Sequence, residues 1–485
     1  MEGNVNGIKI ISNFLWKFCE RSGLQFVNLI VQIVLARLLT PSDFAIVAII
    51  TVFITIANIF IQTGFGTALI QCEQVDDDDY STIFFVSLIT SVMLVLILAI
   101  IAPLISSFYK MSELTILIRA QSIIIFIGAF NTVQQAVMSR RMQFKKNFYA
   151  RIIACLISGI IATIAAYKGL GVWSIILLNV SNNLFYTILL WILVKWKPKL
   201  VFSINSFNKL FSFSWKLILA NLIGTLYDNL RTLVMGKFYD KSLLGYYNRS
   251  DMIASSLMNG VTSSISAVML PVLSRYQNDV NKIKEKLKKT FSINCFICVP
   301  MMFGLAATAD NLIIILFTSK WSTSGIFLSI LCIGYSFYPI HSANLQALYA
   351  IGESGVVLKL EIIKKLLGVL LIFLSIPFGV YAVAASVVVM SILSTVINSI
   401  PNIRYIGYSL REQILDVSPY YIMSIIMSII VYTVGNVLPF KLILCKLLLQ
   451  IAIGIGVYLL QCVIVRPYAY KYFINVIKQR SKLIK

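Results

Sequence analysis

Histidine and acidic residues are scarce in this sequence. It has one histidine, His341, and 19 acidic against 41 basic side chains. With one histidine, most metal sites are excluded. A hydrolytic triad could use only His341 as its base. No GxxxxGK[ST] segment is present either, which excludes a P-loop for nucleotide phosphates. These absences argue against an enzyme, and we expect no metal and no cofactor.

Cysteine is present but has no pattern of a metal or disulfide framework. The eight cysteines are scattered and mostly lie inside apolar runs. Cys295 and Cys298 form a CxxC within one such run, without a second pair nearby, so we interpret them as packed apolar side chains. The polar N-terminus leads directly into the first apolar run, and no cleavable signal peptide is expected.

Long apolar runs dominate what is there. Hydrophobic residues make up 59% of the chain, above the 45–50% or so of soluble domains. The pattern predicts an all-α polytopic membrane protein with about 14 transmembrane helices. The expected spans are 12–38, 43–70, 81–108, 115–139, 148–168, 171–194, 212–236, 243–273, 288–308, 323–350, 357–376, 379–403, 414–437 and 441–465.

The charges between these runs orient the protein. Basic segments at 140–151, 195–216, 275–289 and 466–485 fall on one side, together with both termini. That side is expected to be the cytoplasm, so the basic character reflects membrane topology and not nucleic-acid binding.

Two cytoplasmic segments have a distinctive composition. Residues 195–211 mix basic and bulky apolar side chains and are expected to lie along the inner leaflet. The acidic run Asp76–Asp79 is interpreted as a solvated turn that caps the third span, with a regulatory cation site as the alternative.

The two halves repeat weakly. FLWK at 14–17 returns as FSWK at 213–216, and GVWS at 171–174 returns as GVYA at 379–382. Such repeats are how many transporters build two lobes around a central site. We expect an N-lobe at 1–200, a C-lobe at 201–408, and two extra helices with a basic tail at 409–485.

A line of polar residues runs along the first span. Lys17, Arg21, Gln25, Asn28 and Gln32 fall within about 80° of arc on a helix. Glu20 can partly neutralise Lys17, whereas Arg21 has no acidic neighbour on its own helix. The line is either a polar helix–helix seam or one wall of a wet cationic cavity.

The repeat predicts that the seventh span faces the first, and this span is polar too. Asn221, Thr225, Asp228 and Thr232 fall within about 60° of arc, and Arg231 lies about 60° from Asp228. Asp228 would either alternate between Arg21 and a proton or sodium ion, or form a static ion pair.

Other polar residues lie inside later spans. Arg119 and Arg249 are near the outer ends of the fourth and eighth spans, where they either line the outer mouth or snorkel to headgroups. In the eleventh span, an expected Glu361–Lys365 pair leaves Lys364 less committed. His341 is interpreted as a packed residue at a kink.

Four segments carry a resemblance to a known family. At LARLLTPSDFAIVAIITVFI (35–54), GFGTALIQ (64–71), LLGYYNRSD (243–251) and LPVLSRYQND (270–279), the chain resembles the polysaccharide transporter family. These are Wzx-type flippases, in the superfamily of multidrug exporters and the lipid II flippase. Relatives often carry an acidic residue before the Gly-Phe of the second span, where this chain has Gln62 and Thr63.

The resemblance implies two six-helix lobes, two extra helices, and an undecaprenyl-pyrophosphate-linked oligosaccharide as the substrate. Flipping across the bacterial cytoplasmic membrane would use alternating access, coupled to H⁺, Na⁺ or the membrane potential. The protein is expected to be a monomer that contacts membrane lipid, a polysaccharide polymerase and a chain-length regulator.

Site roles follow from that substrate. We expect Lys17 and Arg21 to hold the pyrophosphate. Asp228 and Glu20 are the ion-coupling candidates. The further substrate-binding candidates are Gln25, Asn28, Gln32, Asn221, Arg231, Arg119, Arg249 and Lys364.

Three alternatives stay open. A cationic-drug exporter of the same superfamily would prefer an acidic and aromatic cavity. A polysaccharide polymerase or ligase generally has a sizeable external loop, which this chain lacks. A lipid scaffold would not need the repeat.

Overall fold

The computed structural model describes residues 23–277, 279–437 and 442–483, and every regular element within them is a helix. The chain divides into two compact units, of which the first ends at Gly245 and the second begins at Tyr246. Each unit is described by itself below. The lobes drawn from the repeat, with a boundary near residue 200, stay a prediction.

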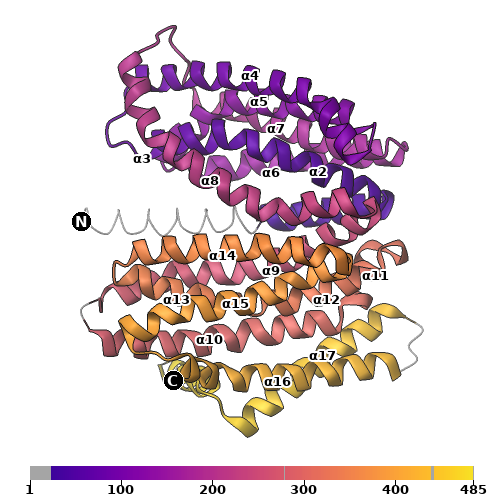
Figure 1. Ribbon diagram of the computed structural model, residues 1–485, viewed down its shortest axis with the longest axis vertical. Coiled ribbons are helices and arrows are strands. Elements are labelled where there is room, and N and C mark those ends of the chain that lie inside the picture. The colour runs from indigo at the N-terminus through magenta and orange to yellow at the C-terminus, as the bar shows by residue number, and fades with distance from the viewer. Residues whose placement is uncertain (1–22, 278, 438–441, 484–485) are drawn as a thin grey trace. The chain divides into compact units, whose positions relative to one another are not determined.

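The first unit is a bundle of long helices (Figure 1). The α4–α5, α6–α7 and α5–α7 pairs pack closely together. Its core includes the rings of Phe84, Phe130, Trp191 and Trp196, which meet mostly edge to face. The elements are Gly23–Leu38, α2 (Pro41–Asn58), η1 (Ile59–Gly66), α3 (Thr67–Gln71), α4 (Asp77–Tyr109), α5 (Leu114–Arg140), α6 (Phe144–Tyr167), α7 (Val172–Val194) and α8 (Ile204–Phe238).

The second unit contains most of α9 and all later helices. Packing is closest between α10 and α16, α12 and α15, α16 and α17, and α14 and α15. The elements are α9 (Lys241–Ser274), α10 (Val280–Ala307), α11 (Ala309–Phe317), η2 (Ser319–Trp321), α12 (Ser324–Tyr335), α13 (Tyr338–Ala350), α14 (Ser354–Ser375), η3 (Ile376–Phe378), α15 (Val380–Ile406), α16 (Leu410–Val437), α17 (Ile443–Val465) and α18 (Tyr468–Leu483).

The all-helical prediction is confirmed, and the predicted spans follow the helices closely. Ten described helices are long and apolar enough to cross a membrane, or eleven when the bent α8 is one span. The count of fourteen stays a prediction. Two elements differ from expectation: α11 is a separate short helix before the tenth span, and that span is broken into α12 and α13.

Local sequence signals explain several helix ends. Thr40 and Asp43 form a capping box at the start of α2, with Pro41 at the first helical position. Asp76 and Asp79 form a second box at the start of α4. The expectation that the acidic run caps the third span is therefore confirmed.

Candidate functional site

The first polar helix is described from Gly23 onward. Lys17, Glu20 and Arg21 lie outside the described residues, so their roles stay predictions. Gln25 and Asn28 are exposed and Gln32 is half-buried. The Asn28 side-chain oxygen accepts a hydrogen bond from the Cys155 thiol on α6 at 3.2 Å.

Packing on α6 orients this helix. A Cβ added to Gly23 would lie 3.2 Å from the Phe148 ring, and one added to Gly159 would lie 2.6 Å from Val31. Glycine at position 159 makes the closer of these two approaches possible, and glycine at position 23 relieves the other. The side of the helix that carries Gly23 and Val31 thus packs on α6, while Gln25 and Asn28 remain accessible.

The polar face of α8 is accessible too. Asn221 and Asp228 are exposed, Arg231 is half-buried, and Thr232 is buried at 7% exposure. Asn221 donates to the carbonyl of Leu217 on its own helix at 2.8 Å. Polar side chains within a membrane span must be solvated or paired, because acyl chains offer them no partner.

The polar residues of the two faces are spaced alike along the chain. Ser42, just after the first span, and Ser242, just after α8, are 200 residues apart, and their hydroxyls lie 3.0 Å apart. The same offset relates the polar positions of the two helices. The related positions are Arg21 and Asn221, Gln25 and Thr225, Asn28 and Asp228, and Gln32 and Thr232.

A close backbone contact supports the same junction. A Cβ on Gly245 would lie 2.0 Å from the carbonyl oxygen of Pro41. Pro41 and Gly245 belong to two of the segments that carry the family resemblance. The turn after the first span thus packs directly on the start of α9.

The end of α8 is fastened to its neighbours at this junction. Lys241 pairs with Glu113 at 2.6 Å, and the Tyr109 hydroxyl lies 3.4 Å from the carbonyl oxygen of Leu233. The Lys237 ammonium donates to the Phe108 carbonyl and lies 4.0 Å from the Phe108 ring centroid. The first span and α8 both end here, so they run in the same direction.

A π-helix, η1, occupies the second span at the Gly-Phe segment. π-Helical turns are rare and often occur at functional sites. The carbonyl of Gly64 accepts a hydrogen bond from Ser214 of α8 at 3.2 Å, and a Cβ on Gly64 would lie 2.6 Å from Ile218. This third resemblance segment thus makes close contacts with α8.

Amide side chains face α5 from the same stretch. The Gln62 amide nitrogen would lie 3.0 Å from a Cβ on Gly128, and the Asn58 oxygen 3.6 Å from it. The Asn58 oxygen is buried without a hydrogen-bond partner among the described residues. This stretch therefore presents neutral amides to α5, and one of them, Gln62, lies where the resemblance led us to expect an acidic residue.

The two arginines expected near the outer mouth have different environments. Arg119 is exposed, and its Nε donates to the carbonyl of Ala99 at 3.2 Å. Arg249 is only 4% exposed and lies under the rings of Phe317 and Trp321, at 5.5 and 5.8 Å from their centroids. Burial excludes snorkelling to headgroups for Arg249.

The expected pairing in the eleventh span is wrong. Glu361 of α14 forms its ion pair with Lys364 at 2.5 Å, and not with Lys365. The Lys364 side chain is only 11% exposed. The i,i+3 geometry prevails because Lys364 lies on the buried side of the helix and needs a partner more than Lys365 does.

Asp77 and Asp79 of the acidic run are paired. The Asp77 carboxylate forms an ion pair with the Lys199 ammonium at 3.0 Å, and the Asp79 carboxylate forms one with the Lys209 ammonium at 3.6 Å. The hydrogen bond to Asp77 raises the pKa of Lys199 above its usual range. No group of three or more metal-ligating side chains occurs among the described residues.

A buried amide network in the second unit escaped the sequence analysis. Asn344 donates to Gln413 at 3.0 Å, and Asn402 donates to Asn344 at 2.6 Å. Asn398 donates to the carbonyl of His341 at 3.2 Å. The sequence signal was the i,i+4 pair Asn398 and Asn402 in an apolar span, which polar residues enter only when they have partners.

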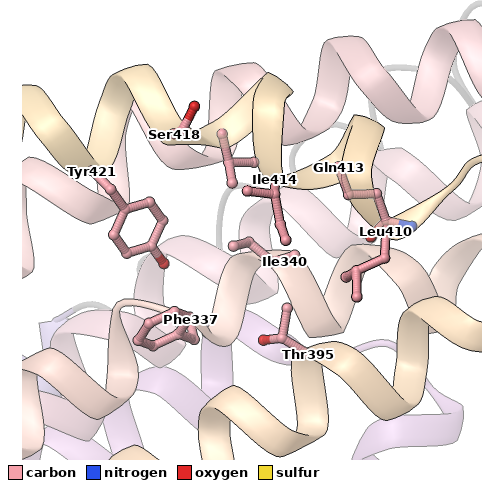
Figure 2. Close-up of a pocket in the computed structure, with 9 residues that line it drawn as sticks. Phe337, Ile340, Thr395, Leu410, Gln413, Ile414, Ser418 and Tyr421 are labelled. Carbon is pink, nitrogen blue, oxygen red and sulfur yellow. The ribbon is translucent and has the colours of Figure 1, made fainter.

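A pocket of about 220 Å³ lies between α13, α15 and α16. Figure 2 shows Phe337 and Tyr421 at one end and Leu410 and Gln413 at the other, with Ile340 and Ile414 between them. The lining has no charged side chain and contains none of the predicted site residues. Its chemistry suits a hydrocarbon chain better than a sugar or a pyrophosphate.

Comparison with known proteins gives a consistent group of relatives. Residues 34–325, more than half of the chain, match the family described as "Polysaccharide biosynthesis protein". The succinoglycan biosynthesis transport protein ExoT of Rhizobium meliloti is 23% identical over 73% of this chain and 72% of its own length. The lipopolysaccharide biosynthesis protein WzxC of Escherichia coli is 22% identical over 90% of this chain and 89% of its own.

The fold matches solved transporters. The lipid II flippase MurJ, in an inward closed conformation, has a TM-score of 0.76 at 19% identity, covering 96% of this chain and all of its own. An inward-facing multidrug transporter of the MATE family has a TM-score of 0.58 at 16% identity, covering 79% and 94%. At these identities, the likeness concerns the fold alone.

Proposed function

Because this chain belongs to the polysaccharide biosynthesis protein family, we propose that it flips undecaprenyl-pyrophosphate-linked oligosaccharides across the bacterial cytoplasmic membrane. It is a multi-pass membrane protein of a family of flippases and transporters, not of enzymes. In the proposed reaction the glycan moves from the cytoplasmic to the outer leaflet. Both termini are proposed to face the cytoplasm.

The observation that carries the proposal is the pair of repeat-related polar faces. Gln25 and Asn28 on one helix, and Asn221 and Asp228 on α8, are accessible side chains inside apolar spans. Exposure of these groups to lipid would cost about 3 kcal/mol for the carboxylate alone. A hydrated cavity avoids that cost and offers hydrogen-bonding groups to a sugar chain.

The substrate suits such a cavity in three parts. Lys17 and Arg21 would bind the pyrophosphate, since a guanidinium matches phosphate oxygens in a bidentate arrangement. Amides of both faces, with Arg231, would meet the glycan. The polyprenyl tail can remain in lipid, because transfer into protein gains little over the bilayer.

Alternating access supplies the movement in this proposal. Opening toward the outer side would separate the Ser42–Ser242 contact. Asp228, bound in turn by Arg21 and by H⁺ or Na⁺, would couple that opening to an ion gradient, with Glu20 as a second candidate. A polysaccharide polymerase and a chain-length regulator are the proposed partners.

The test uses cells whose surface polysaccharide depends on this protein. We expect Arg21→Gln to reduce export at least about tenfold, the effect of losing about 1.4 kcal/mol of binding. The measurement is surface polysaccharide per cell, with membrane insertion checked by immunoblot. Arg404→Gln, at the exposed end of α15, is the matched control and should export normally.

A second measurement isolates the flipping step. Right-side-out membrane vesicles that carry the Arg21→Gln protein should accumulate lipid-linked oligosaccharide in the inner leaflet, where an added glycan hydrolase cannot reach it. Normal export, or normal accessibility of the glycan, would remove Arg21 from the mechanism.

A further inference from the structure

The segment between α7 and α8 is irregular but firmly held. We name residues 195–204, from the end of α7 to the first residue of α8, the strap. Its backbone N–H groups at Lys199 and Ser203 donate to the hydroxyls of Ser81 and Thr82 on α4, both at 3.0 Å. The carbonyl of Trp196 accepts from Gln134 of α5 at 3.2 Å. Hydrogen bonds to α4 and α5 therefore fix the shape of the strap before any ligand binds.

The strap projects large apolar side chains that no other described part of the chain covers. Leu200 is 94% exposed, Ile204 66% and Phe202 55%. Trp196, by contrast, is buried against Tyr80 and Phe84. The buried ring anchors the strap, and its apolar tip points away from the protein.

The lysines of the strap likewise fall into two groups, those in ion pairs with α4 and those without a described ion pair. Lys199 and nearby Lys209 are used by Asp77 and Asp79 of α4. Lys195 and Lys197 are exposed and form no ion pair with any described residue. Two uncommitted cations beside an apolar tip are typical of a segment that lies in an anionic membrane interface.

The location fits a membrane surface. The strap lies at the end of the first unit where α4 begins and α5 ends (Figure 1). Arg141 and Met142, in the turn after α5, are exposed at this end as well. Apolar and basic side chains thus share one end of the bundle, where a leaflet boundary must cross it.

We propose that the strap is a binding site for anionic phospholipid. Leu200, Phe202 and Ile204 insert among the acyl chains, and Lys195 and Lys197 bind the headgroup phosphates. Because the strap leads directly into α8, a bound lipid also fixes the start of the helix that carries Asn221 and Asp228.

Photocrosslinking tests the proposal on the full-length protein. A benzophenone amino acid replaces Phe202, and the protein is reconstituted in vesicles of equal parts phosphatidylcholine and phosphatidylglycerol. Mass spectrometry identifies the adducts. We expect phospholipid adducts in which phosphatidylglycerol is enriched several-fold over its share of the bilayer, with the enrichment lost in high salt.

Matched controls separate specific binding from general lipid exposure. The same probe at Phe378, an 80% exposed residue in η3, should give adducts without enrichment. Lys195→Gln with Lys197→Gln should abolish enrichment at position 202. Lys110→Gln with Lys168→Gln removes the same charge at the other ends of α4 and α6 and should leave the enrichment intact.

Two results would overturn the proposal. Adducts to protein only would show that position 202 faces another part or another copy of this chain and not lipid, and lipid adducts in bilayer proportions would exclude an anionic-lipid site. Should the variant at 202 fail to fold, the probe at Ile204 gives the same readout. None of these measurements depends on transport.

Discussion

Gly245 shows how one missing side chain decides a contact. The Pro41 carbonyl occupies the space that any Cβ would need, and backbone cannot move aside as a flexible side chain can. Two resemblance segments meet at this point. Glycine is needed here because a Cβ would overlap the Pro41 carbonyl, and not because of backbone conformation, since Gly245 has no positive φ.

Gly245→Ala should therefore destabilise the junction by about 1–3 kcal/mol. The measurement is the thermal unfolding midpoint of the purified protein in detergent, together with surface polysaccharide in cells. Gly260→Ala, in the same helix but with open space around its added Cβ, is the control. That variant should unfold at the same temperature or higher, because alanine favours the helix. Equal midpoints for the two variants would contradict the steric account.

Among the elements, η1 is the one that ordinary helix propensity does not explain. Its wide turns place the Gly64 carbonyl within reach of Ser214 and bring the Gly64 backbone against Ile218. The π-helix is thus stabilised partly from outside, by α8.

We expect Gly64→Ala to weaken the packing between η1 and α8, since the new methyl group would overlap Ile218. Ile218→Ala removes the obstructing atoms, so the double variant should recover part of the lost stability. A double-mutant cycle of unfolding midpoints measures the coupling, which should be about 0.5–3 kcal/mol. Strictly additive effects would show that the two residues do not compete for the same space.

On the scale of the whole molecule, the end of the first span and the end of α8 meet at Ser42 and Ser242. These related hydroxyls lie 3.0 Å apart, within a junction that Lys241–Glu113 also fastens. In the proposed alternating-access cycle, opening toward the outer side would break this junction.

Ser42→Cys combined with Ser242→Cys should lock the junction with a disulfide. We expect oxidised cells to lose polysaccharide export and to regain it after a membrane-permeant reductant is added. The two single variants keep all native cysteines and should export normally under oxidant. Normal export by fully crosslinked protein would show that transport does not require this junction to open.

Much of the fold follows from local chemistry that the sequence displays. Apolar runs of about 20 residues must become helices in a membrane, because each backbone polar group needs an internal partner. Capping is equally local: the acidic run predicted a helix start, and Asp76 and Asp79 form the capping box of α4. The polar lines of the first span and α8 were visible for the same reason, since helical periodicity is fixed.

By itself, then, the sequence determined the helical class, the positions of the helices and the two polar faces. Only the tertiary structure decided partners: Glu361 takes Lys364 and not Lys365, Arg249 lies under aromatic rings, and the acidic run pairs with lysines more than 100 residues away. Helix geometry depends on neighbours a few residues along the chain. Pairing and burial depend on which helices pack together, and that is set by side chains far apart in the sequence.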